Sequence, residues 1–349
     1  MNSFTEGLIE QQVINQELLQ TIRLLGEYKG KQELFKEQAP QVIKTLRQAA
    51  IIQSTESSNR IEGITVPWER IKKLVGEKTT PRDRSEQEIA GYINVLNTIH
   101  SSYAQIPFTP NIILQLHRDI YQFSAQPGGR WKAIDNEISA TYPDGTKVVR
   151  FRPTSAYETP AAMARLHQEF NRLWESGKIE PLLLIPSYIL DFLCIHPFLD
   201  GNGRMARLLT LLLLYKAGYQ VGRFISLERL VEQTKESYYD TLYLASQGWH
   251  EAKHNLLPWW EYFLGVMLLA AYREFEQRVG YVTAAKGTKT AMVLDAISSL
   301  PPEFSIRELQ EKCPKVSIDL IRRILRRQRD AGVLECVGRG VDARWRKQG

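Results

Sequence analysis

The chain has 349 residues, enough for two or three domains with at least one sizeable core. With 43% hydrophobic and 24% charged residues it has the composition of a soluble globular protein. We expect no signal peptide. We also expect no membrane span, because Pro186, Asp191 and His196 interrupt the longest apolar segment. Three widely spaced cysteines indicate neither a disulfide framework nor a zinc site, which predicts a cytoplasmic protein.

The excess positive charge lies at the C-terminal end of the chain. The formal net charge is +6, and from Lys286 onward the sequence has 14 Lys+Arg and 8 Asp+Glu, leaving 31 charges of each sign before it. An excess confined to one end indicates a separate basic module rather than a generally basic protein.

The first 80 residues are expected to be helical, and two further helices are expected up to residue 121. The apolar spacing predicts helices over 41–63, 68–75, 85–103 and 109–121, the first of them ended by Gly63. The polar stretch 76–85 is a candidate linker. Ser85 and Glu88 have the spacing of a capping box at the start of the third helix.

Residues 127–153 differ from the helical segments around them. Gly, Asp-Gly and β-forming residues replace the helical period, and the fragment PDGTKVVRFRP (143–153) predicts a turn and a short strand. A hairpin or flap is therefore expected at 131–152. Helical periods resume over 159–177, 181–195, 204–218, 227–248 and 257–280, so the predicted fold class is mainly all-α.

The most polar junction of the chain is HPFLDGNGRMAR (196–207), which joins two strongly apolar helices. Polar groups in such a place need partners, and a ligand can supply them. The glycines beside Asn202 allow a sharp turn. A helix that begins near Gly203 would direct the free amides of Gly203, Arg204, Met205 and Ala206 toward an anion such as phosphate.

The charged residues of this stretch complete a site for phosphate chemistry. Arg204 and Arg207 are three residues apart, so both can reach a polyphosphate. Asp200 is suited to hold Mg²⁺ beside bound phosphates, and His196 can accept a proton from an attacking hydroxyl. Each residue alone has an ordinary structural explanation, but together they favour nucleotidyl or phosphoryl transfer.

These twelve residues resemble the motif His-Pro-Phe-x-Asp/Glu-Gly-Asn-Gly-Arg-x-x-Arg of Fic (filamentation induced by cAMP) domains, with every fixed position matched. The resemblance extends over roughly residues 85–280. It implies a helical Fic core that transfers AMP from ATP to a protein hydroxyl and releases pyrophosphate. The roles it implies are general base for His196, Mg²⁺ ligand for Asp200, α- and β-phosphate contacts for Gly201, Asn202 and Gly203, a phosphate clamp for Arg204, and a γ-phosphate contact for Arg207.

Two further segments are similar to parts of that family. The hairpin at 131–152 takes the place of the Fic flap, which holds the target segment by strand addition. The segment ESYYDTLYLAS (236–246) resembles the helix that lines the adenine pocket, with Tyr238 and, behind it, Tyr239 as candidate contacts. Either tyrosine can equally be a core residue.

Residues 58–63, SNRIEG, resemble the inhibitory motif Ser/Thr-x-x-x-Glu-Gly/Asn of autoinhibited Fic proteins. Ser58 and Glu62 are four residues apart and share one helix face. The resemblance implies that Glu62 pairs with Arg207, so that Arg207 cannot hold a γ-phosphate. In some Fic enzymes the same glutamate supports removal of AMP, and this alternative stays open.

The basic C-terminal segment predicts a winged helix-turn-helix. A helix, a short helix at 305–313 and a helix at 317–330 precede two strands, 333–337 and 343–346, around the turn Gly338-Arg339-Gly340. The third helix has an apolar face of Leu320, Ile321, Ile324 and Leu325, and its arginines, Arg322, Arg323, Arg326, Arg327 and Arg329, project elsewhere. Such arginines suit DNA phosphates, although winged helices also bind proteins.

The sequence therefore predicts three regions: an N-terminal helical region (1–84), a Fic catalytic domain (85–284) and a winged helix-turn-helix (285–349). The expected function is autoinhibited protein adenylylation with ATP and Mg²⁺, acting on a protein hydroxyl and on the enzyme itself. DNA is the expected partner of the C-terminal domain, and a homodimer is a further expectation. The alternatives are a DNA-binding regulator with a nucleotide-sensing core, and a Fic enzyme that uses another donor such as UTP or removes AMP.

Overall fold

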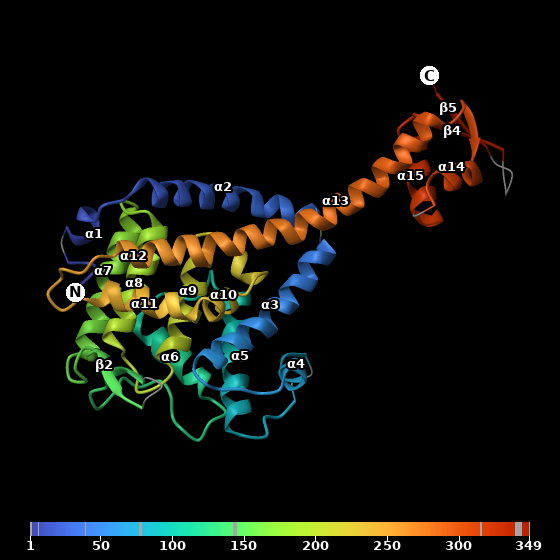
Figure 1. Ribbon diagram of the computed structural model, residues 1–349. Helices are drawn as coiled ribbons and strands as arrows, with labels where there is room; N and C mark the ends of the chain where they lie inside the picture. The colour runs from blue at the N-terminus through green and yellow to red at the C-terminus, as the bar shows by residue number, and fades with distance from the viewer. Residues whose placement is uncertain are drawn as a thin grey trace. The chain divides into compact units, whose positions relative to one another are not determined.

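The computed structural model describes the chain except for residues 1, 6, 39, 77–78, 142–144, 315, 339–343 and 349. Helices make up most of it (Figure 1), which confirms the predicted fold class. The described residues form two compact units, Met1–Glu276 and Gln277–Gly349. None of the described helices is both long and apolar enough to cross a bilayer. The predicted three-region division stays a prediction.

The N-terminal helices pack on the rest of the first unit. They are α1 (Leu8–Gln11), α2 (Gln16–Gln38), α3 (Pro40–Ile61) and α4 (Trp68–Gly76). Gly63, just beyond α3, has φ 81°, a left-handed conformation that favours glycine and ends the helix as predicted. Helix α3 packs on α10, so the predicted inhibitory motif, which lies at its end, is part of the packed structure.

The centre of the first unit is made of two buried helices, α8 and α9, as their apolar sequences predict. The helices that build this unit from Arg84 onward are α5 (Arg84–Ser102), α6 (Pro110–Ile120), α7 (Thr159–Ser176), α8 (Pro181–Ile195), α9 (Asn202–Lys216), the 3₁₀ turn η1 (Val221–Arg223), α10 (Leu227–Gln233), α11 (Lys235–Ser246), α12 (Leu257–Glu261), the π-helical η2 (Tyr262–Leu269) and the start of α13 (Ala270–Ser299). A continuous helix was predicted at 227–248. This was wrong in one respect, because Thr234 separates α10 from α11.

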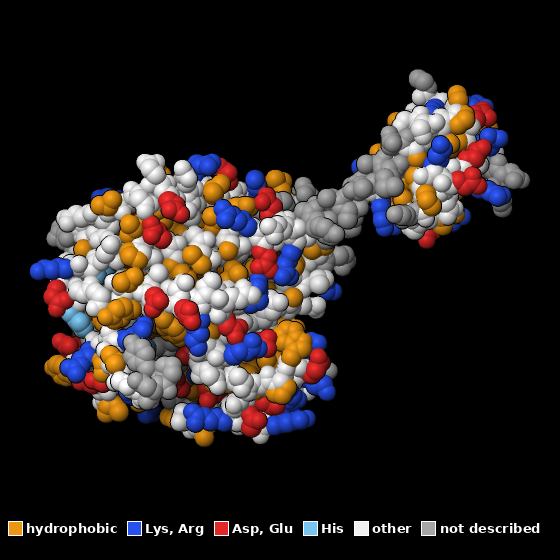
Figure 2. All heavy atoms as spheres, viewed as in Figure 1, with side chains coloured by type: hydrophobic (Ala, Val, Ile, Leu, Met, Phe, Trp, Pro, Cys, Tyr) orange, Lys and Arg blue, Asp and Glu red, His pale blue; other side chains and the backbone are white. Residues whose placement is uncertain are grey.

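The predicted hairpin is present. Strands β1 (Ile138–Thr141) and β2 (Lys147–Phe151) pair antiparallel, and part of the predicted turn, residues 142–144, lies outside the described residues. On the visible face of this unit, basic and acidic side chains are interspersed (Figure 2), as expected for the part of the chain without excess charge.

The predicted capping box at Ser85 and Glu88 was wrong. Helix α5 begins at Arg84, and its cap is Asp83, whose side chain accepts a hydrogen bond from the amide of Glu86. Glu88 is instead buried, and its carboxylate binds Arg204 in the first turn of α9. The pattern of apolar and polar residues around Glu88 did not indicate that this side chain is buried.

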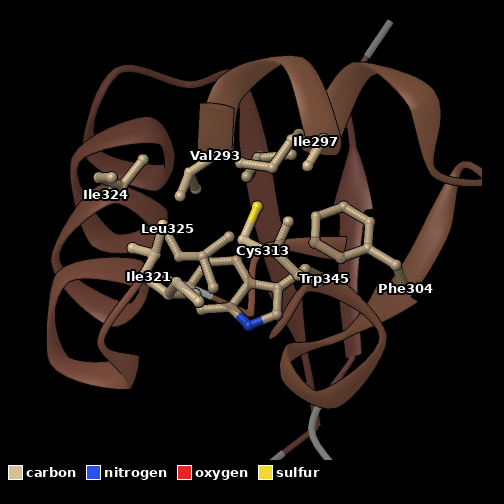
Figure 3. Close-up of a cluster of buried hydrophobic side chains, with 12 residues drawn as sticks. Val293, Ile297, Phe304, Cys313, Ile321, Ile324, Leu325 and Trp345 are labelled. Atoms are coloured by element: carbon tan, nitrogen blue, oxygen red, sulfur yellow. The ribbon is translucent and has the colours of Figure 1, made fainter. Parts of the chain in front are cut away.

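The second unit has its own core. After the end of α13 come β3 (Glu303–Ser305), α14 (Ile306–Lys312), α15 (Ile318–Asp330), β4 (Leu334–Val337) and β5 (Arg344–Lys347). The strands form an antiparallel sheet in the order β3-β5-β4. Apolar side chains from every one of these helices and from all three strands meet around Cys313 and Trp345 (Figure 3).

The sequence predicted this element order except for β3, a three-residue strand too short to show a period. The predicted Gly338–Gly340 turn lies mostly outside the described residues. The winged-helix assignment itself stays a prediction.

Candidate active site

His196 lies in the turn between the two buried helices. It caps α8 with φ 51° and ψ 60°, a left-handed conformation that is uncommon for a residue with a side chain. Its imidazole Nδ1 lies 3.2 Å from the carbonyl oxygen of Leu193, an acceptor only. Nδ1 therefore carries the proton and donates it, which leaves the lone pair of Nε2 available.

The protonation state of His196 suits a proton acceptor. Its pKa is lowered to about 4, chiefly by burial and also by the nearby charge of Lys132, while the hydrogen bond to Leu193 and the carboxylates of Glu62 and Asp200 act in the opposite direction. With a pKa well below its ordinary value, the imidazole is neutral at pH 7. A neutral, oriented imidazole is the state that a general base requires.

The loop that follows His196 is shaped by Asn202. The Asn202 Oδ1 accepts the amide of Phe198 at 2.9 Å, and its Nδ2 donates to the carbonyl of Phe198 at 2.7 Å. Gly201 has φ 81° and forms the N-cap of α9. The side chain of Asn202 thus closes the loop, and its predicted phosphate contact stays a prediction.

Fewer amides of α9 are free than the sequence predicted. The helix begins at Asn202, and the amide of Met205 already donates to the carbonyl of Gly201 at 2.9 Å. The predicted anion contact through the amide of Met205 was therefore wrong, because the helix starts earlier than expected. The first three amides, those of Asn202, Gly203 and Arg204, have no partner within the helix and point out of its first turn. Ala206, one residue beyond Met205, instead lines a small cavity.

Arg204 lies deeper than a simple phosphate clamp. Its side chain is only 1% exposed. Nη1 donates to Glu88 at 2.8 Å and Nη2 to the hydroxyl of Tyr121 at 2.8 Å, while its buried Nε has no partner in the described part of the chain. Glu88 thus fixes the guanidinium beside the loop. The predicted phosphate contact of Arg204 stays a prediction.

Asp200 is the candidate metal ligand. Its side chain is 59% exposed, and its Oδ2 lies 3.7 Å from Nη2 of Arg204. Oδ1 accepts the amide of Gly201. Among the described residues, no group of three or more His, Cys, Asp or Glu side chains could hold a metal ion. One exposed carboxylate beside an anion site still fits Mg²⁺, which takes few protein ligands and completes its shell with phosphates and water.

Arg207 is bound by Ser58 and Glu62, the residues of the predicted inhibitory motif. Its side chain is 6% exposed, and its Nη2 lies 2.7 Å from Oε1 of Glu62. Ser58 accepts twice, at Oγ from Nε (2.9 Å) and at its carbonyl from Nη2 (2.8 Å). Burial lowers the pKa of Arg207, but the charge and hydrogen bond of Glu62, together with Tyr238 and Tyr92, outweigh it and raise that pKa above its ordinary value.

The carboxylate of Glu62 also lies against the first turn of α9. A Cβ atom on Gly203 would collide with it and would come within 3.2 Å of Nη1 of Arg207. The positive end of the α9 dipole and the free amides of its first turn therefore face the carboxylate of Glu62, which directly follows α3. An anionic ligand of this turn would compete with Glu62 for the same charges.

A cavity lies beside Arg207. It is lined by Ala206, Arg207, Tyr238, Trp259 and Phe263, among others. Tyr238 is 5% exposed and packs edge-on against Trp259, whereas Tyr239 is 39% exposed. The structure thus brings Tyr238 to the cavity beside Arg207 and leaves Tyr239 at the surface. Their contact with an adenine stays a prediction.

Several residues of the site escaped the sequence reasoning. They are Glu88 and Tyr121, which hold Arg204; His117, whose ring is stacked on Phe198; and Lys132 and Asn136, which contact the backbone of the motif. The amide of Gly129 donates to Nδ1 of His117, so its Nε2 carries the proton and donates to the carbonyl of Asp200 at 3.0 Å. These residues lie far from the motif in sequence, where no spacing rule reveals them.

Comparisons with known proteins point to one family. Residues 107–214 match the Fic/DOC family. The chain is 28% identical over 214 residues to the protein adenylyltransferase Fic of Drosophila erecta, a match that covers 59% of this chain and 39% of the relative. The corresponding protein of Drosophila yakuba is 27% identical over 215 residues, with 59% and 39% covered. The chain thus spans about two fifths of the length of these curated relatives.

The fold has a counterpart among solved structures. A Fic family protein from Desulfovibrio desulfuricans G20 superposes with a TM-score of 0.61 at 22% identity, and the match covers 97% of each chain. At this identity the likeness supports the fold alone.

Proposed function

Because the chain contains a domain of the Fic/DOC family, we propose that it is an autoinhibited protein adenylyltransferase. It transfers AMP from ATP to a hydroxyl group of a protein target, and of itself. The observation that carries this proposal is the carboxylate of Glu62 lying on the first turn of α9, bonded to Arg207. A turn built for an anion and covered by a carboxylate of the same chain supports both nucleotide binding and inhibition.

The proposed reaction uses His196 as the base. The target oxygen forms a bond to the α-phosphorus of ATP while the bond from that phosphorus to the bridging oxygen of the β-phosphate breaks, and pyrophosphate leaves. The proton of the hydroxyl passes to Nε2 of His196, whose lone pair is free because Nδ1 donates to Leu193. The first amides of α9 bind phosphate oxygens.

Asp200 would hold Mg²⁺ through its exposed carboxylate. The ion would neutralise part of the charge on the phosphates. Arg207, once free of Glu62, would bind the outermost phosphate through its guanidinium fork.

Inhibition in this proposal depends on how firmly α3 is held. Ser54 of α3 donates to Glu228 of α10 at 2.7 Å, and Nη1 of Arg60 lies 3.2 Å from Oε1 of Glu232. Lys235 donates to the carbonyl of Ile61, the last residue of α3, at 3.3 Å. These contacts fasten the end of α3 next to Arg207, so loosening them should loosen Glu62.

Glu232→Ala is therefore expected to raise self-adenylylation. A partly exposed ion pair contributes up to about 1 kcal/mol, so the expected rise is roughly twofold to fivefold. The measurement is AMP incorporation by the intact protein. Glu236→Ala, which removes an exposed carboxylate of α11, is the matched control and should match wild type. In a Glu62→Gly background Glu232→Ala should add nothing, and a further rise there would contradict a role in holding the brake.

A second candidate function is DNA binding by the Gln277–Gly349 unit. Helix α15 buries Ile321, Ile324 and Leu325. Its residues Arg323, Arg326 and Arg327 are exposed and make no ion pair with a carboxylate of the described residues. Three unpaired guanidinium groups on one helix suit contact with phosphates of a duplex.

Replacing Arg323, Arg326 and Arg327 with alanine is expected to weaken DNA binding. Each lost phosphate contact should lower the slope of log K against log salt by about one. The measurement is fluorescence anisotropy of a labelled duplex over a salt series. Arg329→Ala is the control, because Arg329 is already paired with Asp330 at 2.8 Å. An unchanged slope in the triple variant would rule out this surface.

A further inference from the structure

Four successive carbonyl groups at the catalytic turn are bound by one short segment. Nζ of Lys132 donates to the carbonyl of Ile195 at 3.0 Å, and the amide of Lys132 donates to that of Pro197 at 2.8 Å. Nδ2 of Asn136 donates to the carbonyls of His196 at 3.4 Å and Phe198 at 3.0 Å. The carbonyl groups of residues 195–198 are therefore all bound by Lys132 and Asn136.

The two side chains also bind each other. Nζ of Lys132 donates to Oδ1 of Asn136 at 2.8 Å, which orients the amide so that its Nδ2 faces the turn. Lys132 is only 3% exposed, and burial lowers its pKa to about 8. A cation at the C-terminal end of α8 is favoured by the helix dipole, which offsets part of the cost of burying it.

The turn needs such support. His196 is held in a left-handed conformation that a residue with a side chain adopts only when its surroundings fix it. Within the described part of the chain, its ring makes a single hydrogen bond, to the carbonyl of Leu193. The position of Nε2 therefore depends on the backbone of residues 195–198, which Lys132 and Asn136 hold.

We propose that Lys132 and Asn136 are positioning residues that hold the backbone of His196 so that Nε2 faces the reacting hydroxyl. This inference rests on the proposed transferase function, since it assigns His196 the role of base. Neither Lys132 nor Asn136 bonds to the amides of Asn202, Gly203 and Arg204, which are proposed to bind phosphate, so their role is separate from nucleotide binding.

The same segment carries the flap. Strand β1 begins two residues after Asn136, at Ile138, and Oδ1 of Asp135 accepts the amide of Ala156, which follows β2. Both ends of the hairpin are thus joined to the segment that holds His196. A target strand that docks on the hairpin would therefore bind next to the segment that holds the backbone of His196.

The test uses the intact chain with Glu62→Gly as parent. Asn136→Asp keeps the acceptor for Lys132, and so the buried contact, but removes the donor to the carbonyls of His196 and Phe198. The control is Asn171→Asp, which removes a comparable bond, from Nδ2 of Asn171 to the carbonyl of Phe108 at 3.1 Å, between other elements. Three quantities are measured: the turnover number for AMP transfer, the Kd of ATP, and the NMR signals of the His196 ring, assigned by comparison with His196→Ala.

In Asn136→Asp we expect turnover to fall about 100-fold, the loss that a misplaced catalytic group causes, with the Kd of ATP unchanged and the His196 signals shifted. Asn171→Asp should leave all three as in the parent. Lys132→Arg, which keeps the charge, should retain more turnover than Lys132→Met.

Unchanged turnover and unchanged His196 signals in Asn136→Asp would overturn the inference. A rise in the Kd of ATP as large as the fall in turnover would overturn it too. The NMR signals report the placement of His196 whether or not AMP is transferred. An inactive parent would therefore count against the proposed function, while the signals would still decide the role of Asn136.

Discussion

Glu62→Gly is expected to raise AMP incorporation by about one to two orders of magnitude, the range of an ordinary coupling free energy between two sites. Without its carboxylate, α3 no longer neutralises Arg207, which is then free for a phosphate. The first turn of α9 is uncovered at the same time, because the atom that a Cβ of Gly203 would meet belongs to Glu62. The measurement is incorporation of labelled AMP into the purified protein over time.

Two variants separate the charge of Glu62 from the flexibility that glycine introduces. Glu62→Gln keeps the length of the side chain and removes its charge, so its activity should lie between those of wild type and Glu62→Gly. Arg207→Ala, added to Glu62→Gly, should lose the gain, because the group that is set free is then missing. Equal incorporation by wild type and Glu62→Gly would refute the inhibitory role of α3.

His196→Ala in the Glu62→Gly background is expected to lower the rate of AMP transfer by a factor of about 100 to 10,000, the contribution of a positioned general base. The imidazole is the proton acceptor in the proposed reaction, so its removal leaves the attacking hydroxyl without a positioned base. ATP should still bind, because the cradle at α9 does not include this side chain. Turnover and the Kd of ATP, measured on the same preparation, separate the two effects.

The pH dependence offers a second check on His196. Its pKa is lowered to about 4, chiefly by burial, so the base stays unprotonated from pH 7 down to the vicinity of that value. The rate of Glu62→Gly should therefore not fall between pH 7 and 6, where an ordinary histidine would become protonated. A rate that declines with an apparent pKa near 6.5 would contradict the buried, neutral state of His196.

The sequence was most informative where the site is contiguous. His196, Asp200 and Arg207 belong to one twelve-residue stretch that forms a turn followed by a helix, so the motif could be read from the local sequence. The apolar patterns of α8 and α9 likewise predicted two buried helices, because burial on all faces leaves a continuous apolar run.

The supports of the site were not predictable in this way. Glu88 was predicted to cap a helix and Lys132 was given no role, but the fold buries them against Arg204 and the carbonyl of Ile195. Their partners lie 116 and 63 residues away, and a contact of that kind has no period along the chain. The start of α9 was predicted near Gly203, whereas the helix begins at Asn202 with Gly201 as its cap.

One measurement tests the central claim most directly: wild type, Glu62→Gly and Glu62→Gly/His196→Ala incubated with Mg²⁺ and ATP labelled at the α-phosphate or, in parallel, at the γ-phosphate. We predict covalent labelling from the α-phosphate alone, strong in Glu62→Gly, weak in wild type and absent from the double variant. Label retained from the γ-phosphate, or equal α-labelling of all three proteins, would contradict an adenylyltransferase that uses His196 as base and Glu62 as brake.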